Sequence, residues 1–212
     1  MKKLLLLLLI LGSSLLQAED LFGQATQASL KGDQVNAFKL MRKAAQRGDI
    51  RALVNTGLMY EYGQGTARDL KKARYWYEKA AERHDPKAQY NLALLYEKGK
   101  GVETDQEKAN AWYLKAAQNN SIDAQFALAN RYYTGKGIKQ DLKQAAYWFR
   151  QAADYGYAPA QYNIGLMLLN GQGVRMNKIF AFEYWLKAAR QSHPEAQKGL
   201  DRLCRESPWA CR

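Results

Sequence analysis

The chain repeats itself with a strict period of 36 residues. Small and aromatic residues recur at intervals of 36 residues through most of the sequence, with no insertion or deletion between copies. An alanine column comprises Ala52, Ala88, Ala124, Ala160 and Ala196, and an aromatic column comprises Trp76, Trp112, Trp148 and Tyr184. Two glycine columns comprise Gly63, Gly99, Gly135 and Gly171, and Gly65, Gly101, Gly137 and Gly173. A period of this size is typical of a stacked repeat protein, in which each unit buries its apolar faces against its neighbours.

Each copy of the repeat has the pattern of two helices joined by a glycine loop. In the copy that starts at Ala52, we expect a first helix over roughly 50–62. It should end at Gly63, because glycine adopts positive φ without a Cβ penalty. Asp69 is placed to cap a second helix over roughly 70–83. Apolar residues with helical spacing form one face of that second helix: Ala73, Trp76, Tyr77, Ala80 and Ala81.

The joins between copies carry their own signal. Gly48, His84, Asn120, Gly156 and Ser192 occupy equivalent positions there. Glycine and asparagine tolerate the left-handed conformation that ends many helices, so we expect a left-handed turn at every join. Asp85-Pro86 then provides an N-cap and a proline in the first turn of the next helix.

These patterns predict an all-α fold, a solenoid of stacked helix-turn-helix repeats with no strands. Full copies occupy 52–87, 88–123, 124–159 and 160–195. We expect capping helices from a truncated copy at 19–51, and a capping helix with a disulfide loop at 196–212. Lys198 and Asp201 replace Tyr162 and Gly165 of the preceding copy. This change gives the last helix the polar outer face that a terminal repeat requires.

The first eighteen residues have the features of a secretory signal peptide. Lys2 and Lys3 precede an apolar run from Leu4 to Leu11, and small polar residues follow. We expect cleavage after Ala18 and a periplasmic or secreted mature protein without a membrane span. The alternative is an uncleaved membrane anchor, but the apolar run is shorter than the ~20 residues that span a bilayer.

Cys204 and Cys211 are the two cysteines of the chain. An even number of cysteines in a secreted protein indicates a disulfide. A continuous helix would hold their Cα atoms about 10 Å apart, which is too far for a disulfide bond. We therefore expect Pro208 to end the helix, so that the chain folds back into a small disulfide loop. The alternative, a redox pair, lacks the C-x-x-C spacing.

The chain is basic, with 32 Lys plus Arg against 20 Asp plus Glu. Removal of Lys2 and Lys3 with the signal peptide would lower the net charge from +12 to +10. Outside the cytoplasm, such a protein meets anionic lipids, wall polymers or acidic proteins. The alternative is that the charges only keep helix faces solvated. No basic run is interleaved with aromatic residues, so we do not expect nucleic-acid binding.

The copies that start at Ala88 and Ala124 resemble Sel1-like repeats. They read AQYNLALLYEKGKGVETDQEKANAWYLKAAQNN and AQFALANRYYTGKGIKQDLKQAAYWFRQAADYG. That family has an A-x-Y-N-L-G opening, a Y-x-x-G-x-G-V loop, an aspartate before the second helix and a W-Y-x-K-A-A close. The resemblance implies an α/α superhelix related to tetratricopeptide repeats and a role as an adaptor between proteins. Secreted bacterial members resemble host-interaction factors and periplasmic assembly proteins.

The sequence lacks the motifs of serine β-lactamases, metal-dependent hydrolases and nucleotide-binding enzymes. Some cysteine-rich relatives of the family are described as β-lactamase-like, but Ser29, Ser121 and Ser192 do not start an S-x-x-K motif. Metal hydrolysis needs three or four convergent ligands, and the two histidines, His84 and His193, both fall at joins. The glycine loops do not have P-loop or dinucleotide-binding spacing. We expect no enzymatic activity, no metal and no cofactor.

The candidate binding surface is the concave face, which we expect the first helices of the copies to line. Its candidate residues are the amides Asn55, Asn91 and Asn163 and the aromatic residues Tyr90, Phe126 and Tyr162. An amide beside an aromatic ring can hold an extended peptide backbone and pack against its side chain. The alternative is that the amides bond to neighbouring backbone and the rings pack between helices.

We therefore predict a protein–protein interaction scaffold of the bacterial envelope or secreted space that binds a peptide or protein segment. Two alternatives stay open. One is a basic structural factor that contacts wall polymer or anionic lipid. The other is a host-interaction factor.

Overall fold

The computed structural model describes residues 20–211, which contain eleven α-helices, one 3-10 helix and no strand. This agrees with the expected all-α fold. The chain divides into two compact units, one up to Ala80 and one from Ala81. Among the described residues, no helix is both long and apolar enough to cross a membrane. The expected signal peptide at 1–18 lies outside the described residues.

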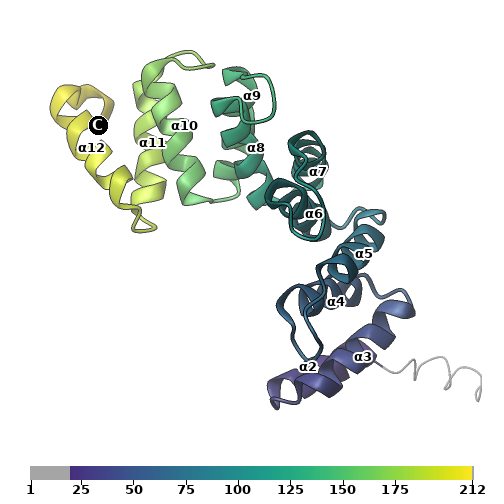
Figure 1. Ribbon diagram of the computed structural model, residues 1–212. Coiled ribbons are helices and arrows are strands. Elements are labelled where there is room, and N and C mark those ends of the chain that lie inside the picture. Colours follow the sequence, from purple (N-terminus) through teal and green to yellow (C-terminus); the bar gives the residue numbers. More distant parts are fainter. Residues whose placement is uncertain (1–19, 212) are drawn as a thin grey trace, which may run out of the picture. The chain divides into compact units, whose positions relative to one another are not determined.

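The first unit contains four helices that follow one another closely along the chain (Figure 1). The Asp20 carboxylate caps the first of them, since it accepts the Gly23 N–H at 2.9 Å. The rings of Phe38 and Tyr60 meet edge-on with centroids 5.1 Å apart, which packs the second helix of the unit onto the third. The four are α2 (Leu21–Leu30), α3 (Gln34–Gln46), α4 (Ile50–Tyr62) and α5 (Leu70–Ala81).

The second unit is a stack of helical hairpins. Helices α6 and α7, α8 and α9, and α10 and α11 form the hairpins, and α7 contacts α8, α9 contacts α10 and α11 contacts α12 (Figure 1). This arrangement confirms the predicted solenoid of helix-turn-helix units. The helices are α6 (Pro86–Lys98), α7 (Gln106–Gln118), α8 (Ile122–Thr134), α9 (Leu142–Asp154), α10 (Ala158–Asn170), α11 (Lys178–Ala189) and α12 (Pro194–Glu206), followed by the 3-10 helix η1 (Pro208–Cys211).

The glycine loops form as predicted and also dock one hairpin on the next. Gly137 and Gly173 both have positive φ, of 66° and 68°. A Cβ on Gly173 would overlap the Leu142 carbonyl, and the Gly137 carbonyl accepts a hydrogen bond from Asn110 Nδ2 at 2.6 Å. The second glycine of the loop is therefore needed both for its backbone conformation and for close approach to the preceding hairpin.

The predicted left-handed joins are also present. The φ angles are 61° at His84, 64° at Asn120 and 63° at Ser192, although none of these residues is glycine. Helix α5 ends at Ala81, two residues before the expected Arg83, because the turn to His84 occupies the last positions. In this turn the His84 N–H donates to the Ala81 carbonyl at 3.0 Å.

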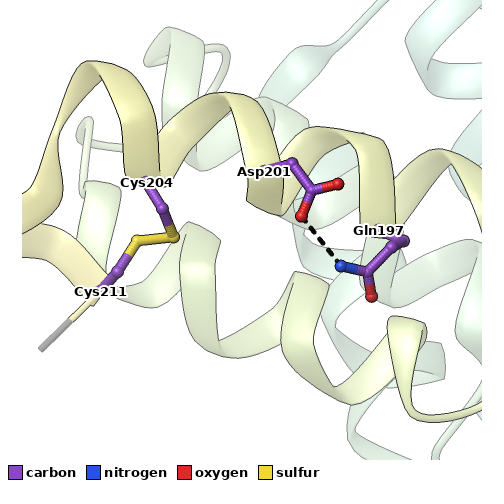
Figure 2. The surroundings of a disulfide bond; sticks show 4 residues. All are labelled: Gln197, Asp201, Cys204 and Cys211. Atoms are coloured by element: carbon purple, nitrogen blue, oxygen red, sulfur yellow. Dashed lines mark hydrogen bonds between the residues drawn. A yellow bond between two sulfur atoms is a disulfide. The ribbon is translucent and has the colours of Figure 1, made fainter.

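The expected disulfide joins Cys204 at the end of α12 to Cys211 in η1, with the Cα atoms 5.7 Å apart (Figure 2). Helix α12 ends at Glu206, and Pro208 begins the 3-10 turn that brings the second cysteine back. One turn earlier on α12, the side chain of Gln197 donates to Asp201 at 3.0 Å (Figure 2). Lys198 and Asp201, the two residues of the predicted polar face of this helix, are both exposed.

A column of buried glutamines links successive hairpins of the second unit. The column comprises Gln89, Gln125 and Gln161, and the Nε2 atoms of Gln125 and Gln161 donate to the carbonyls of Ala117 and Ala153 at 3.2 and 3.1 Å. These carbonyls belong to the last residues of the preceding helix pair. The glutamines therefore satisfy backbone acceptors that the helix ends leave open.

The Oε1 atoms of these glutamines accept a hydrogen bond in two of the three copies but not in the third. Gln89 Oε1 accepts from Asn119 at 2.8 Å, and Gln161 Oε1 accepts from Gln191 at 3.0 Å. Tyr155 is the equivalent residue in the hairpin between them, and its hydroxyl lies 3.4 Å from Asn120 Oδ1 instead. Gln125 Oε1 is therefore buried without a hydrogen-bond partner among residues 20–211.

We expect the Tyr155→Gln variant to be more stable than the wild-type protein by about 0.5–1.5 kcal/mol, because it supplies a donor to a buried acceptor. Tyr155 is 56% exposed, so its removal leaves little apolar contact to lose. Urea unfolding followed by circular dichroism measures the change. Tyr155→Met is the control of similar length without a donor, and an equal effect of both variants would contradict the assignment.

Candidate binding groove

The predicted aromatic residues are partly buried and pack between helices. Tyr162 stacks on Trp185 and on His193, with centroids 6.0 and 5.0 Å away. The ring of Tyr90 lies 5.7 Å from that of Tyr113. Phe126 contacts Phe149 and Tyr157, at 5.7 and 5.0 Å. These rings contribute to helix packing and keep part of their surface exposed.

The predicted amides differ in their hydrogen bonding. Asn55 in the first unit donates to the Arg51 carbonyl of its own helix at 2.9 Å. Asn91 and Asn163 are half-buried, and their side chains form no hydrogen bond with any residue in the range 20–211. Asn163 is therefore a polar group with both its donor and its acceptor available.

Two adjoining hollows run along the first helices of the second unit. One, of about 150 Å³, lies between α8 and α10 and includes Asn130, Tyr133 and Asn163. The other, of about 570 Å³, lies between α10 and α12 and includes Tyr162 and Lys198. Leu166 lines both, so they form one surface that we call the first-helix groove. Its main residues are Asn130, Tyr133, Tyr162, Asn163, Leu166, Lys198 and Arg202.

The groove brings together only part of the predicted set. Tyr162 and Asn163 line it, whereas Tyr90, Asn91 and Phe126 lie on α6 and α8 outside both hollows. Asn55 belongs to the first unit. Leu166 and Asn170, which the sequence interpretation missed, follow Asn163 at helical spacing. Extension of that spacing along the helix would have identified them.

The chemistry of the groove is that of a recognition surface. Leu166 and Leu169 supply apolar contact, and Asn163 offers a free amide. Lys198 and Glu195 on α12 add exposed charges of both signs. Such a mixture of apolar floor and few polar groups can bind a chain segment through its backbone and one or two side chains.

A buried polar network lies between the hairpins α6/α7 and α8/α9. Glu97 accepts from the Tyr113 hydroxyl at 2.6 Å and from Lys136 Nζ at 2.7 Å. Arg131, with a side chain only 4% exposed, lies 3.4 Å from the same carboxylate and donates to Gln106 at 3.0 Å. Its guanidinium carbon is 4.9 Å from the centroid of the Tyr113 ring. These contacts attach one hairpin to the next.

The network changes the pKa of Glu97. Burial acts to raise the pKa of this carboxyl, but hydrogen bonds from Lys136 and Tyr113 and the charge of Arg131 act against burial. The hydrogen bonds and the positive charge outweigh burial, so the pKa of Glu97 lies below its ordinary value. Burial, together with the hydrogen bond to Glu97, raises the pKa of the Tyr113 hydroxyl, which stays protonated and continues to donate.

The tyrosine–glutamate pair varies between copies as a unit. In the first unit, Tyr77 donates to Glu61 at 2.9 Å, at positions equivalent to Tyr113 and Glu97. In the next hairpin both partners change, to Phe149 and Tyr133, which together line the smaller hollow. The polar pair is therefore a local solution to packing, and its loss in α8/α9 contributes to the groove.

Neither histidine lies in a group that could hold a metal. Among the described residues, no three histidine, cysteine, aspartate or glutamate side chains converge. His84 occupies a left-handed join. His193 caps α12, where its Nδ1 accepts the Ala196 N–H at 3.4 Å. Both positions agree with the prediction that these are turn residues.

The model for the Sel1 repeat matches residues 21–49, 50–85, 86–121, 122–157 and 158–193. The chain belongs to the Sel1 repeat family. The first of the five Sel1 copies covers α2 and α3, the helices of the truncated copy expected at 19–51. The other four start two residues before the expected copies, at the first residue of α4, α6, α8 and α10.

Solved structures of Sel1-repeat proteins have the same fold. A Sel1 repeat protein from Oxalobacter formigenes is 34% identical, with a TM-score of 0.78 over 81% of this chain and 50% of that one. A protective antigen of uropathogenic Escherichia coli with the SLR fold is 28% identical, with a TM-score of 0.78 over 81% of this chain and 37% of that one. This Sel1-repeat chain therefore spans half or less of the length of these two relatives.

A short similarity also extends to mammalian proteins. The DAP3-binding cell death enhancer 1 of Rattus norvegicus is 52% identical over 42 residues, which are 20% of this chain and 8% of that protein. The matched length corresponds to little more than one repeat.

The lowered pKa of Glu97 predicts a specific loss of stability in acid. A carboxyl whose pKa is lower in the folded state stabilises the fold above its unfolded pKa of about 4.3, and this contribution is lost as pH falls through the lower, folded value. We expect Glu97→Gln to destabilise the protein by about 2–4 kcal/mol at pH 7, because Arg131 would stay buried without a charged partner. The difference from the wild type should shrink toward pH 3.

Urea midpoints measured at pH 7 and pH 3.5 test this expectation. Glu103→Gln removes an exposed carboxylate of the α6–α7 loop and is the matched control, for which we expect no comparable change. A constant difference between Glu97→Gln and the wild type at both pH values would show that the charge of Glu97 plays no part.

Proposed function

We propose that this chain binds an extended peptide or protein segment in the first-helix groove and acts as a non-enzymatic scaffold. Sel1-repeat proteins are generally protein-interaction scaffolds. The observation that carries the proposal is the free amide of Asn163 beside the apolar side chains of Leu166 and Tyr162. An unpaired amide can accept and donate to a peptide backbone, while the apolar contacts hold a side chain.

The same reasoning extends to Asn91 on α6, whose amide is also unpaired among the described residues. Tyr90, Phe126 and Tyr162 would then contribute the exposed edges of their rings. Burial, and next the negative charge of Asp123, raise the pKa of Tyr90, so its hydroxyl stays protonated and can donate. A segment that crossed several first helices would meet such an amide and ring together on α6 and on α10.

We place the protein in the periplasm or outside the cell. The apolar run that follows Lys3, the disulfide between Cys204 and Cys211, and the similarity to a protective antigen of uropathogenic Escherichia coli support this proposal. A disulfide persists in an oxidising compartment and is rare in the cytosol.

The second candidate function is a basic envelope factor that contacts anionic polymer or lipid, and the formal net charge of +12 favours it. Ionic strength separates the two functions. Attachment through exposed charges weakens steeply as salt rises, whereas binding in an apolar groove persists.

We expect peptides selected from a random linear library on the purified, oxidised protein to bind Asn163→Ala about five- to thirtyfold more weakly than the wild type. The expectation follows from the loss of one or two hydrogen bonds of about 1 kcal/mol. Fluorescence anisotropy at low and moderate salt measures the dissociation constants.

Alanine favours a helix, so Asn163→Ala should keep the fold. Gln144→Ala makes the same kind of change on the exposed face of α9, away from both hollows, and should bind the peptides like the wild type. Equal weakening by both variants, or by neither, would remove the groove as the binding site. Binding that disappears with moderate salt would favour the basic envelope factor.

A further inference from the structure

Three large apolar side chains are exposed where the α10–α11 loop enters α11. Met176 is 60% exposed, Ile179 49% and Phe180 51%. Together with Arg150 and Arg175 they form what we call the α11 patch. It belongs to the second unit and shares no residue with the first-helix groove.

The fold does not require apolar residues at these positions. The equivalents of Met176, Ile179 and Phe180 are polar in both preceding copies: Gln140, Lys143 and Gln144, and Thr104, Glu107 and Lys108. The helix start is nevertheless the same in all three copies, because Asn177, Asp141 and Asp105 each cap their helix at 2.9–3.1 Å. The start of the second helix therefore does not depend on apolar residues at these positions.

Two arginines border the same place. Arg150 on α9 and Arg175 in the loop line a hollow of about 610 Å³, whose apolar wall includes Leu168, Val174 and Phe180. Within residues 20–211, neither guanidinium forms a hydrogen bond or an ion pair. Each therefore keeps its full set of donors for a ligand, in the planar arrangement that matches a carboxylate.

We infer that the α11 patch binds an acidic segment of a partner protein, one that carries carboxylates on either side of an aliphatic or aromatic side chain. The apolar side chain would enter the hollow beside Phe180, and the carboxylates would pair with Arg150 and Arg175. Aromatic residues, methionine and arginine are the types that protein interfaces concentrate.

Charge selects this occupant over a second copy of the chain. The chain carries 32 basic residues against 20 acidic ones, so two copies repel each other. The hollow also favours a peptide over a lipid surface. It has the size of a site for one or two side chains, and apolar contact with a bilayer does not require a concave wall.

The preceding copy supplies replacements that suit the same backbone. Met176→Gln/Phe180→Gln installs the residues found at positions 140 and 144 and leaves the net charge unchanged. Arg150→Gln/Arg175→Gln removes the two charges. Because all four residues lie at exposed positions, both double variants should fold like the wild type, which circular dichroism and thermal unfolding check.

The probe is a fluorescent peptide with two glutamates on each side of a central phenylalanine. We expect each double variant to bind it at least tenfold more weakly than the wild type. A second peptide with glycine in place of phenylalanine should bind the wild type weakly. Gln140→Ala/Gln144→Ala changes the equivalent residues of the preceding copy and is the matched control, for which we expect wild-type affinity.

Three results would overturn the inference. The first is equal binding of the phenylalanine peptide to the wild type and to Met176→Gln/Phe180→Gln, which would indicate charge attraction alone. The second is binding to phosphatidylglycerol vesicles, lost in the same variant, without peptide binding. The third is a dimer of the wild-type protein that this variant abolishes. Asn163→Ala should bind the acidic peptide normally, so failure of the groove and failure of the patch are distinguishable.

Discussion

The close approach of helices at alanine is the constraint on which the rest of the structure depends. Alanines on both helices of the copies have no exposed surface at all. They are Ala52, Ala88, Ala124, Ala160 and Ala196 on the first helices, and Ala73, Ala80, Ala109, Ala116, Ala145, Ala152, Ala181 and Ala188 on the second. The distance between packed helices depends on the side chains at the contact. A methyl group at these points keeps the helices close, and larger side chains then fill the spaces on either side.

This constraint explains why local sequence signals predicted so much of the fold. Helix α4 covers the expected 50–62 because its end is determined within a few residues, by Gly63 and by the side chain of Asp49 at its start. The joins at His84 and Ser192 were predictable from their register with Gly48 and Asn120, although histidine and serine alone give no such signal. Because the copies share a period of 36 residues, a feature that is clear in one copy predicts the same feature at the equivalent position of a copy where the local sequence is ambiguous.

The local sequence patterns did not predict the hydrogen bonds between side chains of neighbouring copies. Gln89 and Asn119 meet across 30 residues of sequence, and Glu97 meets Lys136 across 39. Each bond depends on how far a flexible side chain reaches from its own helix. The sequence patterns also predicted only some of the residues that line the groove. Tyr162 and Asn163 line the groove, but its smaller hollow also depends on Phe149 and Tyr133, which replace the tyrosine–glutamate pair of the previous hairpin.

The glycine loops allow side chains to vary between copies while the backbone path stays the same. Two glycines and a capping aspartate or asparagine determine the path of the backbone from one helix to the next. The residues between and after them, such as Arg175 and Ile179, carry no part of that task. Substitutions there alter one contact point at a time, much as hypervariable loops diversify on an antibody framework. A single copy of the repeat can thus specialise for a new ligand while its neighbours stay unchanged.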